Sequence, residues 1–179
     1  MRNKLLIVVH LGSLCGSANF NLGEVDAEKH RTAITQEIAT WPGAIAVISG
    51  EHDIELDLPP FSPLAAALSQ KSFSTYGASL EGALRRAAIR VVDHYDYPLT
   101  DPILVTGAWN DHDGTGCVNT VVNALKIRGF TVSTSINSPA SDIPTNSTAL
   151  PVPKPKIVPI DPATRLVKTD EPHRGAAIR

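Results

Sequence analysis

The sequence predicts an α/β protein in which a mostly parallel sheet lies between two layers of helices, a three-layer arrangement of the Rossmann type. Near-continuous apolar runs at Lys4–His10, at Ala44–Ser49 and from Ile103 onward are typical of strands buried on both faces of such a sheet. Segments with helical periodicity lie between these runs, as parallel crossovers require. At 179 residues, the chain is long enough for one domain with a substantial core.

The first helix is expected over Asp26–Trp41. Ile34 and Ile38 fall on one face at the helical period, and Pro42-Gly43 ends the pattern. Shorter and longer helices are then expected over Ser62–Ser69 and Ala78–Tyr95. The longer one has an apolar face and a second face with three arginines, which we interpret as solvent-exposed: Arg85, Arg86 and Arg90.

The segment Gly50–Pro63 is charged in its first half and rich in proline in its second. A metal site is one interpretation of its polar side chains. An edge hairpin is the other, and Pro59-Pro60 argues against a rigid display of ligands. We therefore predict neither a metal nor a cofactor, while noting the side chains that leave the first interpretation open: Glu51, His52, Asp53, Glu55 and Asp57.

A cysteine marks the start of the last predicted helix. A strand from Ile103 leads into a glycine-rich loop, a helix begins near Gly116–Cys117 and ends at Gly129, and a strand starts at Phe130. The first backbone N–H groups of a helix lack intrahelical partners and carry positive partial charge, which stabilises a thiolate and lowers its pKa. Cys117 is therefore a candidate nucleophile, although a small apolar residue in a tight turn is the simpler interpretation.

The last quarter of the chain differs in composition from the rest. Eight of the 14 prolines lie between Pro139 and Pro172, among polar residues without clear periodicity. We predict an α/β domain over residues 1–138 and an extended proline-rich arm over residues 139–179. Such an arm wraps over its own domain or a neighbouring subunit, or is partly disordered, and we expect a homo-oligomer.

Composition and charge exclude several partners. The net charge is −2 and the basic residues are scattered, so no nucleic-acid surface is expected. No stretch is long enough to span a bilayer. The N-terminal apolar run follows basic residues as in a signal peptide, but His10 interrupts it and Leu14 makes a poor cleavage context, so we interpret it as a strand. With only two cysteines, far apart, a reducing cytoplasm is expected.

Three segments together resemble the isochorismatase-like cysteine hydrolases, which include nicotinamidases and related amidases. Leu5–His10 occupies the place of the family's first strand, which ends in a catalytic Asp. Lys71–Leu84 is similar to its lysine-containing strand, aromatic loop and helix. Val105–Val132, with Gly116-Cys117-Val118, is similar to its nucleophile strand and helix. The resemblance spans roughly residues 4–135 and rests on the order and spacing of short motifs.

The resemblance implies a site for hydrolysis of a small amide-like substrate at a C–N bond. By position, Cys117 corresponds to the nucleophile and Lys71 to the supporting cation. Backbone N–H groups near Gly116 correspond to an oxyanion hole. The predicted contacts to a small-molecule substrate come from Gly116 and three aromatic residues: Phe73, Tyr76 and Trp109.

The sequence departs from the family at its first catalytic position. His10 stands where the family has Asp, and the loop between Gly107 and Cys117 is longer. His10 either acts as the base of a Cys–His pair, or is a hydrogen-bonded structural residue in a site that has lost hydrolysis. A third alternative is that Asp111 or Asp113 supplies the carboxylate.

Three functions therefore compete. The first is a small cysteine hydrolase. The second is a catalytically inactive relative that serves as an oligomeric binding or regulatory protein. The third is a different doubly wound protein that binds, for instance, a phosphorylated ligand at the loops after the strands. Convergence of Cys117, His10 and Lys71 on one pocket would favour the first.

Overall fold

A computed structural model describes residues 4–14, 24–50, 58, 60–108, 110 and 116–138. Its centre is a five-stranded parallel sheet with strand order β3-β2-β1-β4-β5. The strands are β1 (Leu5–Val9), β2 (Ala44–Ser49), β3 (Phe73–Gly77), β4 (Ile103–Gly107) and β5 (Val132–Thr134). The helices are a short 3-10 helix η1 (Leu11–Leu14), α1 (Glu24–Thr40), α3 (Pro63–Ser69), α4 (Glu81–His94) and α5 (Gly116–Ile127).

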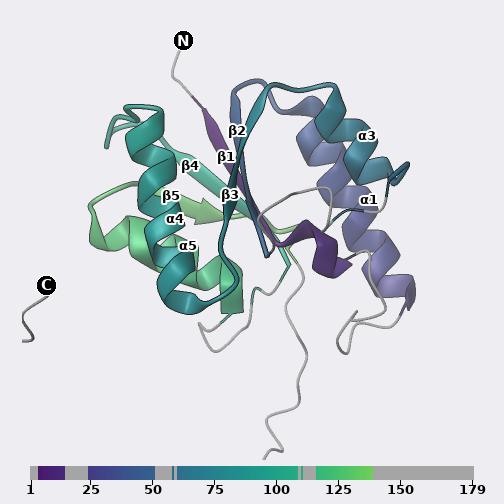
Figure 1. Ribbon diagram of the computed structural model, residues 1–179. Coiled ribbons are helices and arrows are strands. Elements are labelled where there is room, and N and C mark those ends of the chain that lie inside the picture. The colour runs from purple at the N-terminus through teal and green to yellow at the C-terminus, as the bar shows by residue number, and fades with distance from the viewer. Residues whose placement is uncertain are drawn as a thin grey trace, which may run out of the picture. The chain divides into compact units, whose positions relative to one another are not determined.

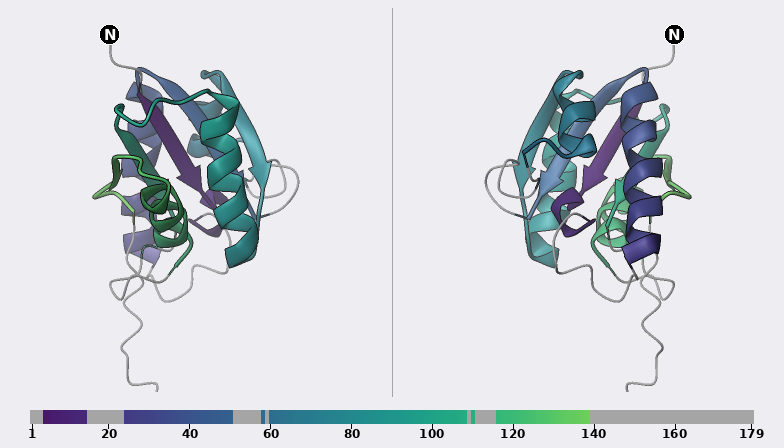
Figure 2. Two further views of the ribbon diagram at one scale, coloured as in Figure 1. Left: turned by 90° about the vertical axis from the view of Figure 1, so that its left-hand side faces the viewer. Right: turned by 90° about the vertical axis from the view of Figure 1, so that its right-hand side faces the viewer.

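The helices form one layer on each side of the sheet, as Figures 1 and 2 show. Leu5, Ile7 and Val9 of β1 point into a core shared with α4 and α5. Leu6 and Val8 point into a second core shared with α1 and α3. All five side chains are fully buried, because alternate residues of a central strand face opposite layers. The predicted three-layer fold is therefore confirmed.

Most predicted elements lie where the apolar patterns place them. The boundaries of β2 match the prediction, and α1 begins two residues earlier than Asp26. The helix α4 begins at Glu81 rather than at Ala78, because β3 continues to Gly77 and a short turn separates the two elements. This shift matters for the site, since it changes which residues follow β3.

The carboxyl ends of the parallel strands share one edge of the sheet, which we call the carboxyl edge. Val9, Ser49, Gly77 and Gly107 are the last residues of four strands there. In this strand order, chain connections run in opposite directions on the two sides of β1, and ligands of such sheets bind outside the carboxyl ends at this switch point. Both the residue after β1 and the start of α5 lie at this edge, so it is the place to look for a site.

The predicted arm, residues 139–179, lies outside the described residues, and the division of the chain into domain and arm stays a prediction. Over the parts of the chain that the structure does describe, no helix is both long and apolar enough to cross a membrane.

Candidate functional site

A pocket of about 340 Å³ opens between the first turns of α4 and α5 at the carboxyl edge. Both helices follow strands of the same parallel sheet and pack against each other, so their N-terminal ends lie on the same side of the molecule. The lining combines a thiol, an ion pair, hydroxyls and an amide over a small apolar patch. The lining residues are Ser79, Glu81, Leu84, Arg85, Gly116, Cys117, Thr120 and Asn123.

Cys117 is the second residue of α5 and is partly exposed in this pocket. Gly116 precedes it with a φ of 88°, a left-handed conformation that glycine adopts at little cost. Val118 and Val121 are fully buried and fix this end of α5 against the sheet. The structure thus brings the predicted nucleophile together with Gly116 at a helix N-terminus, where backbone N–H groups and the helix dipole favour negative charge.

An ion pair that the sequence interpretation missed also lines the pocket. Glu81 is the first residue of α4, and its Oε1 accepts a hydrogen bond from Nη2 of Arg85 one turn later at 2.5 Å. Both side chains are more than half exposed, so they lie at the mouth of the pocket. The i, i+4 spacing was visible in the sequence, but only the shifted start of α4 reveals that Glu81 faces Cys117's pocket.

His10 follows β1 at the carboxyl edge and is 7% exposed. Its backbone adopts a φ of 48°, and its N–H donates to the Ile48 carbonyl at 2.8 Å. The ring Nε2 lies 2.6 Å from the carbonyl oxygen of Ala78. Since a carbonyl oxygen only accepts hydrogen bonds, Nε2 is the protonated donor and Nδ1 is the nitrogen left for other partners.

Lys71 lies at the opposite edge of the sheet from Cys117. It precedes β3, and its ammonium donates to the Trp41 carbonyl at 3.1 Å, just before β2 begins. A strand of five residues separates Lys71 from the carboxyl edge, a length of roughly 16 Å. The prediction that Lys71 lies beside Cys117 as a supporting cation is therefore wrong. The resemblance placed Lys71 within a strand that an aromatic loop follows, whereas β3 starts at Phe73, after Lys71.

Two of the three aromatic residues predicted to contact substrate, Phe73 and Tyr76, are part of β3 itself. Phe73 packs into the core with α1 and α3, on the face away from α5. Tyr76 is 8% exposed in the core with α4, where Arg90 lies 5.7 Å above its ring. Neither residue lines the pocket of Cys117, because residues in a strand pack against the layers instead of extending from a loop. Trp109 lies outside the described residues.

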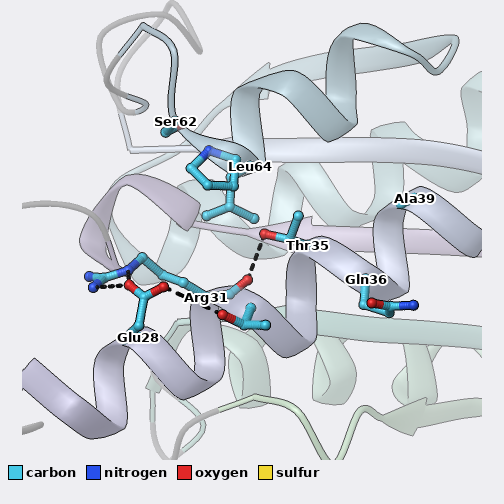
Figure 3. Close-up of a pocket in the computed structure, with 9 residues that line it drawn as sticks. Glu28, Arg31, Thr35, Gln36, Ala39, Ser62 and Leu64 are labelled. Atoms are coloured by element: carbon cyan, nitrogen blue, oxygen red, sulfur yellow. Dashed lines mark hydrogen bonds and ion pairs between the residues drawn. The ribbon is translucent and has the colours of Figure 1, made fainter.

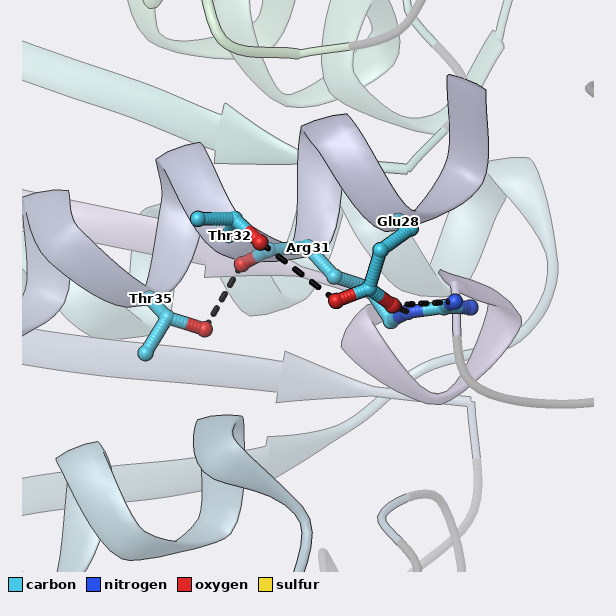
Figure 4. A network of polar contacts seen from close by, with 4 residues as sticks. All are labelled: Glu28, Arg31, Thr32 and Thr35. Carbon is cyan, nitrogen blue, oxygen red and sulfur yellow. Dashed lines mark hydrogen bonds and ion pairs between the residues drawn. The ribbon is translucent and has the colours of Figure 1, made fainter. Parts of the chain in front are cut away.

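A second pocket, of about 260 Å³, lies between α1 and α3 on the other face of the sheet. Figure 3 shows its polar side at Glu28 and Arg31 and its apolar side at Leu64. Glu28 accepts two hydrogen bonds from Arg31 and one from Thr32, so the pair is held on the helix surface (Figure 4). This pocket holds an ion pair like that of α4 but no thiol, and it serves as a natural comparison.

The structure describes none of the candidate metal ligands of the sequence. Within the described ranges, no three His, Cys, Asp or Glu side chains gather as a metal ion requires. The segment 51–57, with His52 and Asp53, falls outside these ranges, as do Asp111 and Asp113. Their predicted alternatives stay predictions.

Comparison with known proteins gives one informative match. No family model matches the chain, and no curated protein matches it. Among solved structures, it is similar to an N-carbamoylsarcosine amidase from Thermoplasma acidophilum, with a TM-score of 0.54 over 82% of this chain and 88% of the amidase. The chain therefore shares the α/β fold of this amidase. At 11% sequence identity, the match establishes the fold that the sequence predicted and leaves the reaction open.

Proposed function

We propose that this protein is an isochorismatase-like, cysteine-dependent hydrolase of a small substrate with an amide-like C–N bond. The observation that carries the proposal is the position of Cys117 in the first turn of α5, lining a pocket at the carboxyl edge. The structural neighbour is an amidase, which is consistent with C–N hydrolysis on this fold.

The expected chemistry proceeds through a thioester. The Cys117 thiolate attacks the substrate's carbonyl carbon, and N–H groups at the start of α5 stabilise the oxyanion. The C–N bond breaks and the amine leaves with a proton, after which water hydrolyses the thioester. The sequence predicts His10 as the base for these proton transfers, but its Nε2–H is already bonded to the Ala78 carbonyl.

Substitution of Cys117 tests the proposal. Ammonia or amine release is measured with a panel of small primary amides and N-carbamoyl amino acids. The panel includes N-carbamoylsarcosine, which the name of the structural neighbour contains. We expect Cys117→Ala to reduce the rate by about 10³-fold or more, since it removes the covalent step. Cys15→Ser, which changes the other cysteine, should retain activity. Equal activity of Cys117→Ala and the wild type would contradict the proposal.

One observation favours the second candidate function, a non-catalytic binding or regulatory protein. Lys71 is separated from Cys117 by the length of β3, so the predicted trio of residues does not assemble in one pocket. If the wild type hydrolyses no member of the panel while a small amide raises its melting temperature, binding without catalysis is the better account. The homo-oligomeric state expected for either function is measured by light scattering.

A further inference from the structure

The proposed reaction needs a group that accepts a proton from water and returns one to the leaving amine. Lys71 lies at the far edge of the sheet, bonded to Trp41. His10 uses its Nε2–H to hold Ala78. Of the described side chains that line the pocket with Cys117, two besides the thiol are charged, and the guanidinium of Arg85 has no acceptor atom for a proton. The remaining one is Glu81.

Glu81 is placed to act on a substrate held at Cys117. It is the first residue of α4, Cys117 is the second residue of α5, and both line the same pocket of about 340 Å³. Arg85 contacts Oε1 of Glu81, which limits the rotation of the carboxylate and leaves Oε2 for a second partner. His10 bonds to Ala78 in the turn that leads into α4, so it steadies the segment that carries Glu81.

On the basis of the proposed function, we propose that Glu81 is its general acid and base, supplied from α4 instead of from the end of β1. Cys117 reacts as the thiolate, so its attack on the carbonyl carbon needs no base. Glu81, in its carboxylic-acid form, gives a proton to the nitrogen as the C–N bond breaks, which releases the amine. The Glu81 carboxylate then takes a proton from water as the hydroxyl adds to the thioester, which restores the carboxylic acid. The C–S bond breaks, which returns the Cys117 thiolate and releases the acid product.

An activated ester separates this role from that of Cys117 without knowledge of the natural substrate. p-Nitrophenyl acetate transfers its acetyl group to a thiolate, and its leaving p-nitrophenolate needs no proton. Only hydrolysis of the resulting acetyl-thioester then depends on a base. Stopped-flow absorbance measures acylation, and intact-protein mass spectrometry measures the loss of the acetyl group from Cys117.

We expect Glu81→Gln to acylate within about twofold of the wild type and to lose its acetyl group about 100-fold more slowly. The unchanged acylation rate also shows that the variant is folded, and glutamine keeps an acceptor for Arg85. The matched control is Glu28→Gln, which alters a similar ion pair in the pocket between α1 and α3 and should leave both rates unchanged. Equal deacylation of Glu81→Gln and the wild type would overturn the role of Glu81 alone. A wild type whose Cys117 takes no acetyl group would overturn the proposed function, and this inference with it.

Discussion

His10 connects two segments that are 68 positions apart in the sequence. Its buried ring donates to the Ala78 carbonyl, and its backbone N–H donates to Ile48 of β2. The sequence placed His10 correctly at the end of β1, but could not reveal the partner, because Ala78 reaches it only through the pairing of β1, β2 and β3. The positive φ of His10 raises the conformational energy of its backbone, and the hydrogen bonds to Ile48 and Ala78 offset this energy.

A pair of substitutions tests the positioning role of His10. His10→Gln keeps an N–H donor at a similar reach, whereas His10→Met has nearly the same length and no donor. We expect the methionine variant to be less stable than the glutamine variant by about 1–2 kcal/mol, because the Ala78 carbonyl loses its donor. Urea unfolding followed by circular dichroism gives the difference. If His10 holds the turn and does not transfer protons, His10→Gln also keeps the wild-type deacetylation rate at Cys117, whereas a catalytic base at His10 would make that rate fall.

At the scale of elements, the ends of β1 and β4 approach each other closely at the switch point. Gly107 ends β4 with a φ of 134°, and a Cβ atom there would lie 2.0 Å from the carbonyl oxygen of Val9. The same oxygen accepts the N–H of Ala108 at 2.9 Å. The glycine is therefore required by the backbone that leads from β4 toward α5 and Cys117.

We expect Gly107→Ala to destabilise the protein by about 3 kcal/mol, from backbone strain and from displacement of the Val9 carbonyl. Gly82→Ala is the matched control: it lies within α4, where the nearest atom to a new Cβ is the end of the Arg86 side chain at 3.6 Å. This control should be neutral or slightly stabilising, since alanine favours helix. If the two variants unfold at the same urea concentration, the close approach of Gly107 to the Val9 carbonyl does not require glycine.

The elements also show why the sheet was predictable and part of the site was not. Apolar runs specify buried strands such as β1 and β2 directly, because burial on both faces needs no knowledge of neighbours. The strand β3 has a mixed composition, so Lys71 and Tyr76 were assigned from a resemblance of short motifs, and the assignment missed where the strand begins. Glu81 was missed for the same reason, since its place depends on where α4 starts.

At the scale of the whole molecule, stability depends on contacts at the edge opposite the pocket. Tyr97 is 8% exposed in the core of α4 and α5, and its hydroxyl donates to the Pro102 carbonyl at 2.9 Å. Burial, reinforced by the nearby Asp101 carboxylate, raises the pKa of Tyr97 above its ordinary value of 10.0. The folded protein therefore holds this proton at pH values where the unfolded chain has lost it.

The sign of the resulting pH dependence follows from this difference. Where the folded state binds more protons than the unfolded state, the free energy of unfolding decreases as the pH rises. We expect the contribution of Tyr97 to be fully present below pH 10.0 and to be lost as the pH rises from there toward the pKa of the folded state. Urea unfolding at a series of alkaline pH values measures the slope, and Tyr97→Phe should make it shallower. An unchanged slope in that variant would exclude Tyr97 as its source.

The fold as a whole was predictable from the alternation of strands and helices, and its likeness to an amidase agrees with the family resemblance of the sequence. The assembly of the site was less predictable. His10, Glu81 and Cys117 follow strand ends at the carboxyl edge, whereas Lys71 precedes β3 and so lies at the opposite edge. The proposed chemistry therefore rests on the carboxyl edge and on the pocket that Cys117 shares with Glu81.

The reactivity of Cys117 tests the central claim most directly. Peptide mass spectrometry measures the rate at which iodoacetamide alkylates Cys117 at pH 7 in the folded protein. The same rate in the chain unfolded in urea is the reference. If the first turn of α5 stabilises the thiolate, Cys117 reacts several-fold faster in the folded protein, although lower intrinsic nucleophilicity offsets part of the gain in thiolate. A folded protein in which Cys117 reacts no faster than in the unfolded chain would contradict the claim.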